Sequence, residues 1–139
     1  MVRTENAIPI KEIKKRLKPL LKEEGLQLVL LFGSAVTGKT HKHSDIDLAF
    51  LFDKPVDILS LTNKVIRLLH DDNIDVVDLR RTSPLMQFSI MKNGKLIYER
   101  TPDIFNVFYS LAFRRYIDTK KMRIAQVEAI EHFLQARGM

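Results

Sequence analysis

The sequence predicts an α+β fold in which a small mixed or antiparallel sheet is packed with helices. Two apolar runs of strand length, 28–32 and 46–52, are separated by a Gly-Ser turn and a short polar segment. That segment is too short for the crossover that parallel strands need, so these two strands are expected to be antiparallel. Helical and strand patterns alternate elsewhere, which predicts a mixed sheet with helices on one face.

The region before the first strand predicts a helix that opens at Pro9, kinks or restarts at Pro19 and ends at Gly25. Apolar residues recur there at the spacing of one helical face: Ile10, Ile13, Leu17, Leu20 and Leu21. The lysines between them are expected on the solvated face: Lys11, Lys14, Lys15, Lys18 and Lys22.

The chain after the second strand predicts two helices and two strands. Asp57 is a plausible N-cap for a helix over 57–72, and a third strand follows at 74–79. Ser83 and Pro84 open a short helix by the cap-plus-proline rule. The Asn93-Gly94 pair ends that helix and leads into a fourth strand, 95–98.

A last helical region is predicted from Thr101-Pro102 to about Ala136, with a break near Asp118-Thr119. Its aromatic residues divide into two groups. Phe105, Phe108 and Phe113 are expected to fill the core, whereas Phe133 is expected to be free to meet a partner.

Length and composition limit the function classes. The 139 residues favour one domain, with a core at about 9–100 and a C-terminal helical region at about 102–137. Without cysteine there is no disulfide and no thiolate metal site. The charged N-terminal residues do not resemble a signal peptide, and no apolar run reaches about 18 residues, so a cytoplasmic location is expected. The net charge of +6 suits a polyanion as well as it suits a lysine-rich surface.

Two carboxylates at the start of the second strand suggest a cation site. Asp45 and Asp47 are two residues apart, so on a strand they share one face and lie about 7 Å apart. Carboxylates beside a core are costly unless something compensates them, and a divalent metal ion does so. Asp75 and Asp78 on the third strand are three residues apart, so only one of them can face the same site.

Residues 33–40, GSAVTGKT, also match the phosphate-binding loop of nucleotide hydrolases, GxxxxGK[ST]. The context does not fit, because such a loop runs directly into a helix of several turns. Here only residues 41–44 separate Thr40 from the acidic strand, and four residues make about one helical turn. Gly38 is better explained as the end of a short helix that Ser34 opens.

Gly33-Ser34, ten residues and then Asp45-Ile46-Asp47 form the pattern GSx10DxD. In its strand–turn–strand context this resembles the polymerase-β nucleotidyltransferase superfamily, in particular the minimal nucleotidyltransferases. The likeness extends over nearly the whole chain, including Ser44 and the segments IDVVDLRRTSPL and NGKLIYE.

The resemblance implies a nucleotidyltransferase (polymerase-β palm-like) fold and a set of site residues. Asp45, Asp47 and Asp75 are implied as ligands of two Mg²⁺ ions and as catalytic residues. Gly33 and Ser34 are implied to hold the triphosphate of ATP. Ser44, Lys39 and Lys42 are further candidate nucleotide-binding residues, and His41 and His43 lie in the same loop.

Within that superfamily the chain looks most like the antitoxins paired with HEPN proteins, which are small helical toxins, usually ribonucleases. This likeness implies an enzyme that transfers AMP from ATP to a tyrosine of a cognate HEPN toxin and releases pyrophosphate. The absence of space for an acceptor domain favours a protein acceptor over a nucleic acid. The alternative is an antitoxin with weak catalysis that neutralises its partner by binding. Arg80 and Arg81 are expected on the surface.

Overall fold

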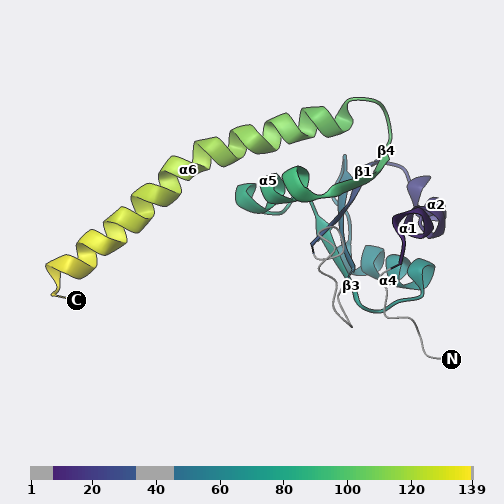
Figure 1. Cartoon of the computed structure of the whole chain (residues 1–139), viewed down its shortest axis with the longest axis horizontal. Coiled ribbons are helices and arrows are strands. Elements are labelled where there is room, and N and C mark those ends of the chain that lie inside the picture. The colour runs from purple at the N-terminus through teal and green to yellow at the C-terminus, as the bar shows by residue number, and fades with distance from the viewer. Residues whose placement is uncertain (1–7, 34–45, 139) are drawn as a thin grey trace.

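A mixed sheet of four strands forms the centre of the computed structural model, which describes residues 8–33 and 46–138 (Figure 1). Its order is β3-β2-β1-β4, with β1 antiparallel to both neighbours and β2 parallel to β3. The antiparallel pairing predicted for the first two strands is confirmed. The strands are β1 (Leu26–Phe32), β2 (Ile46–Phe52), β3 (Ile74–Asp78) and β4 (Lys95–Glu99).

Helices cover both faces of this sheet (Figure 1). On one face lie α1 (Ile10–Arg16), α2 (Lys18–Leu21) and α4 (Ile58–Leu69); on the other lie α5 (Pro84–Asn93) and the first part of α6 (Ile104–Ala136). The prediction of helices on one face is wrong, because β1 and β2 are apolar and buried on both sides. Two-sided burial gives near-continuous apolar runs instead of a simple alternation.

The N-terminal helix is divided as the sequence predicted. α1 ends at Arg16, and Pro19 lies in the first turn of α2, where its missing N–H costs nothing. Ile13, Leu17 and Leu20 are buried against the sheet. The five lysines of this region, Lys11, Lys14, Lys15, Lys18 and Lys22, are all exposed, as predicted.

The parallel pairing of β2 and β3 depends on α4, which connects the two strands. The Asp57 carboxylate accepts hydrogen bonds from the N–H groups of Leu59 and Ser60 and so caps the start of α4. His70, in the left-handed region at φ 54°, ends it. Leu61, Val65 and Leu69 are buried on the face that packs against the sheet. The helix is therefore shorter than the predicted 57–72, but its cap is the predicted one.

The last helix, α6, is continuous over 33 residues, so the predicted break at Asp118-Thr119 is wrong. The Thr119 hydroxyl donates to the carbonyls of Arg115 and Tyr116, and these bonds let a threonine remain inside a helix. Phe105 and Phe108 pack against the core as predicted, but Phe113 is 49% exposed. Beyond α5 the helix continues away from the sheet (Figure 1). Among the described residues, no helix is long and apolar enough to cross a membrane.

A buried glutamine joins α5, α6 and the end of β3. Gln87 is 2% exposed, its side-chain amide donates to the Leu79 carbonyl at 2.7 Å, and its side-chain oxygen accepts from Arg115 at 3.4 Å. Ser83 caps the same helix by accepting from the N–H of Met86. The side chain of Gln87 thus fixes α5 to both neighbours.

Replacement of Gln87 by alanine should lower the free energy of unfolding by about 1–3 kcal/mol, because it removes a buried hydrogen bond and leaves a cavity. Urea denaturation measures this loss. Met86→Ala is the control, since Met86 is 40% exposed on the same helix; its effect should stay below about 0.5 kcal/mol. Equal effects of the two substitutions would contradict the role given to Gln87.

Candidate active site

The strand register brings two aspartates together at one end of the sheet. Asp47 is the second residue of β2, Asp75 is the second residue of β3, and the two are direct partners in the parallel pairing. Partners in neighbouring strands lie about 4.8 Å apart and point to the same face. Ile46 and Leu48 lie in the core on the α4 side, so Asp47 and Asp75 face the α5 side. Asp47 is half-buried and Asp75 is exposed.

Gly33 lies directly against the carboxylate of Asp47. β1 ends at Phe32, which pairs with Asp47 in the antiparallel ladder, and Gly33 follows in the left-handed region at φ 80°. A side chain at Gly33 would overlap Oδ2 of Asp47. The glycine is therefore required for two reasons, its backbone conformation and the space that the carboxylate occupies.

Asp78 belongs to a different environment. It is 6% exposed, its carboxylate accepts from the N–H of Arg80 at 3.1 Å, and its carbonyl accepts from the N–H of Arg81. It pairs with Phe50, whose side chain lies in the core on the α4 side. Asp78 thus stabilises the turn after β3, whereas Asp75 joins Asp47. The side chains of Arg80 and Arg81 are exposed, as predicted.

The other predicted site residues, Ser34, Lys39, Lys42, Ser44 and Asp45, with His41 and His43, lie outside the described residues, as does the short helix predicted after Ser34. Of the predicted site residues that the structure describes, Asp47 lies beside both Gly33 and Asp75. The contact between Gly33 and Asp47 was not predicted from the sequence. No pattern in the sequence signals that contact, because it depends on the register of β1 against β2. Among the described residues alone, no cluster of three potential metal ligands occurs.

The pairing of β1 and β2 also argues against the phosphate-binding loop of nucleotide hydrolases. In that fold the loop leads into a helix that crosses over to a parallel strand. Here Phe32 at the end of β1 pairs antiparallel with Asp47 at the start of β2. The match of residues 33–40 to GxxxxGK[ST] therefore occurs in a connection between antiparallel neighbours.

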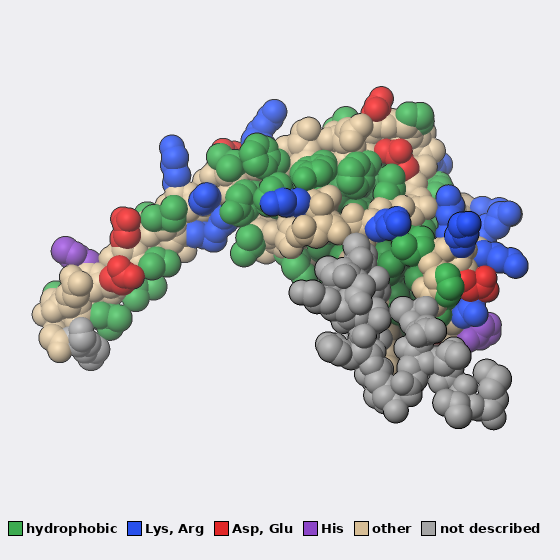
Figure 2. Space-filling view, viewed as in Figure 1, with side chains coloured by type: hydrophobic (Ala, Val, Ile, Leu, Met, Phe, Trp, Pro, Cys, Tyr) green, Lys and Arg blue, Asp and Glu red, His purple; other side chains and the backbone are tan. Residues whose placement is uncertain are grey.

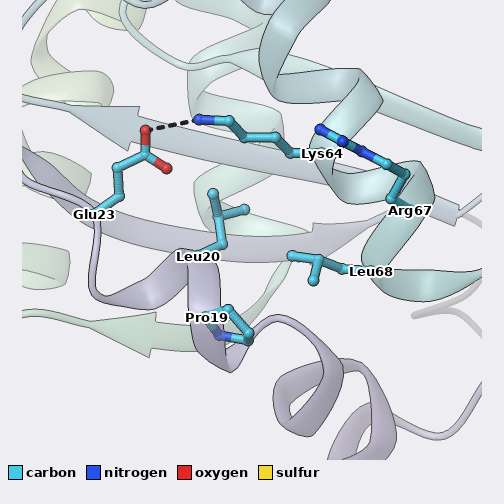
Figure 3. A pocket seen from close by; sticks show the side chains of 6 residues that line it. All are labelled: Pro19, Leu20, Glu23, Lys64, Arg67 and Leu68. Atoms are coloured by element: carbon cyan, nitrogen blue, oxygen red, sulfur yellow. Dashed lines mark hydrogen bonds and ion pairs between the residues drawn. The ribbon is translucent and has the colours of Figure 1, made fainter.

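A surface pocket of about 420 Å³ lies on the opposite face of the sheet, between α2 and α4 (Figure 3). Pro19, Leu20 and Leu68 form its apolar part, and Glu23, Lys64 and Arg67 its charged part. The Nζ atom of Lys64 lies 3.2 Å from Oε1 of Glu23, so the charges of these two side chains offset each other. The aspartate pair faces the other side of the sheet, so this pocket is separate from the candidate site.

Asp78→Ala should destabilise the protein by about 1–2 kcal/mol, because the partly buried hydrogen bond from the N–H of Arg80 to this carboxylate is lost. Asp75→Ala should leave the stability unchanged or slightly higher, because it removes a carboxylate that faces another carboxylate. Thermal melting without divalent metal compares the two variants. A destabilised Asp75→Ala beside a stable Asp78→Ala would reverse the roles assigned here.

The two glycines at positive φ beside aspartates offer a matched comparison. Gly33→Ala and Gly25→Ala should each cost about 1–2 kcal/mol in stability from the left-handed backbone alone. At Gly33 the new methyl group would displace Asp47, whereas at Gly25 it would meet Asp53, 2.6 Å from Oδ1. Only Gly33→Ala should also weaken binding of ATP with Mg²⁺, measured by calorimetry. Equal binding by both variants would contradict the placement of the site at Gly33.

Comparison with known proteins places these features in a family. The family model described as polymerase beta, nucleotidyltransferase matches residues 14–103. The protein adenylyltransferase MntA of Aphanizomenon flos-aquae (strain 2012/KM1/D3) is 30% identical over 142 residues, covering 94% of this chain and 93% of that protein. The MntA of Shewanella oneidensis is 36% identical over 81 residues, covering 56% and 58% of the two chains.

Solved structures of toxin–antitoxin complexes also resemble this chain. A toxin–antitoxin crystal structure with AMP-PNP matches with a TM-score of 0.75 and 28% identity, over 89% of this chain and 99% of that chain. A structure of tri-AMPylated Shewanella oneidensis HEPN toxin with MNT antitoxin matches with a TM-score of 0.71 and 25% identity, over 88% and 99%. The family model covers most of the chain, and the strand order and the paired aspartates agree with it. This chain therefore belongs to the polymerase beta nucleotidyltransferase family and is homologous to the MntA protein adenylyltransferases.

Proposed function

We propose that this protein is an antitoxin that transfers AMP from ATP to a tyrosine hydroxyl of a cognate HEPN toxin, in a Mg²⁺-dependent reaction. The observation that carries the proposal is the pairing of Asp47 with Asp75 beside Gly33. Its relatives are named protein adenylyltransferases, and one structural relative contains an AMPylated HEPN toxin.

The aspartate pair has the chemistry of a magnesium site. Carboxylate oxygens are the ligands that Mg²⁺ prefers, and two neighbouring carboxylates gain from a shared cation because they otherwise repel each other. Asp47 and Asp75 supply oxygens from two strands. Asp45, two residues before Asp47 in the sequence, is the third proposed ligand. These carboxylates would hold the metal ions, which when bound would offset the negative charge of the triphosphate.

The chain's own residues then orient the reactants. Gly33 permits a close approach of the phosphates because it carries no side chain and its backbone turns sharply after β1. Ser34 follows Gly33 in the sequence and is the second proposed phosphate-binding residue. The acceptor oxygen attacks the α-phosphorus, the bond from that phosphorus to pyrophosphate breaks, and the hydroxyl proton passes to a carboxylate of the site or to solvent. Asp75, exposed at the edge of the pair, is the more accessible of the two described carboxylates.

A protein acceptor is supported by what the fold provides and by what the relatives bind. Most of the described chain forms the sheet and the helices around it, and α6 is the part that extends beyond them. A docked partner protein would therefore have to position its own hydroxyl, which raises the effective concentration of the acceptor at the site. The HEPN complexes of the structural relatives supply such a partner class.

Asp45→Ala and Asp47→Ala should each reduce AMP transfer by about a thousandfold while the protein stays folded, because the metal ligands are lost. Transfer of radiolabelled AMP measures the activity. Mg²⁺ should raise the melting temperature of the wild type, and Asp47→Ala should lose most of that increase. Lys39→Ala is the control for the competing phosphate-loop hypothesis. Loss of activity in Lys39→Ala with full activity in Asp47→Ala would overturn the assignment.

A cognate HEPN toxin should gain the mass of one or more AMP units when it is mixed with this protein, ATP and Mg²⁺. Intact-mass spectrometry detects this gain, and peptide mapping identifies the tyrosine. Free RNA and small aminoglycosides, as control acceptors, should remain unmodified. A toxin that is neutralised without any change in mass would instead favour the alternative, in which the antitoxin acts by binding alone.

A further inference from the structure

The part of α6 beyond α5 carries an apolar stripe that nothing in the described chain covers. Its members follow each other at alternating steps of four and three residues, which keeps them on one side of a helix. The apolar members are between 38% and 54% exposed, and Figure 2 shows hydrophobic side chains along this projecting segment. We call this set the α6 stripe: Ile117, Lys120, Ile124, Val127, Glu131 and Leu134.

We propose that the α6 stripe pairs with the α6 stripe of a second copy of this chain, with the two helices antiparallel. The stripe is symmetric about a point between residues 125 and 126. If a two-fold axis lies between the two helices at the level of that point, Ile124 of one copy faces Val127 of the other, and Ile117 faces Leu134. Each contact then occurs twice, as a two-fold interface requires.

The charged members of the stripe favour the same arrangement. Under this symmetry Lys120 of one copy faces Glu131 of the other, so the two charges in the apolar stripe neutralise each other. Lys121 and Glu128, which border the stripe, also come opposite one another. A parallel pairing in register would instead place Lys120 against Lys120 and Glu131 against Glu131. Charge complementarity of this kind sets the orientation of paired helices.

The length available on α6 matches this register. Phe88 of α5 contacts Phe113 and stacks on Tyr116, with ring centroids 5.5 and 4.6 Å apart, so α5 covers α6 as far as Tyr116 and the stripe begins beyond it. In the antiparallel register Ala136, the last residue of one helix, lies level with Arg115 of the other. The helix of the second copy therefore ends at the level where α5 starts to cover α6. The two sheets, and with them the two aspartate pairs, would lie at opposite ends of the paired helices.

Charge exchange tests the pairing in the full chain, studied without any partner protein. Sedimentation velocity over a range of concentrations should show that the wild type is a dimer. Lys120→Glu and Glu131→Lys should each weaken the dimer by about tenfold or more, because like charges then face each other. The double variant Lys120→Glu with Glu131→Lys should restore the wild-type affinity. Met122→Glu is the matched control, since Met122 is 61% exposed outside the stripe and its change should have no effect.

Disulfide crosslinking tests the direction, because the chain contains no cysteine of its own. A mixture of Ile124→Cys and Val127→Cys should form crosslinked pairs faster than either variant alone. A monomeric wild type, a double variant that stays weakened, or faster crosslinking of each variant to itself would overturn the proposal. So would a stripe that becomes protected from hydrogen exchange only after a helical partner protein is added, because the stripe would then belong to that partner.

Discussion

The parallel register of β2 against β3 is the constraint on which the candidate site depends. It places Asp47 beside Asp75 on one face of the sheet, while Asp78, three residues further along β3, points to the other face. A shift of one residue would turn every side chain of β3 to the opposite face. The register is held by Ile46, Leu48 and Val76, which are buried on the α4 side. The acidic pair is thus positioned by the hydrophobic core behind it.

The two faces of the sheet differ in the residues and helices that lie on them. The α4 face holds the larger buried cluster, and its helices present lysines to solvent. The α5 face carries the aspartate pair, the turn at Gly33, and the helices α5 and α6. α5 is fixed to β3 and α6 through Gln87, so the surface next to the site is rigidly connected to the base of the long helix.

The elements with local signals were predictable, and those that depend on long-range packing were not. Asp57, Ser83 and Pro19 mark helix starts through their own hydrogen bonds or ring geometry, and the structure places helix starts at these points. The predicted break at Thr119 fails because its hydroxyl bonds within the helix. The aromatic character of Phe113 predicts a place in the core, yet this side chain contacts Phe88 of α5 and is still 49% exposed. No local pattern reveals how much of a side chain a neighbouring helix covers.

The sequence by itself determined the chemistry of the candidate site: a Gly-Ser turn after one strand and an acidic pair at the start of the next, in an α+β chain. This information is local, because spacing along a strand decides which side chains share a face. Strand alternation left Asp75 and Asp78 as alternatives and the family resemblance implied Asp75; the strand register pairs Asp75 with Asp47. Only the tertiary structure decided that a carboxylate occupies the space beside Gly33 and that helices cover both faces of the sheet. These facts follow from the register between strands distant in sequence, which the packing of the whole core selects.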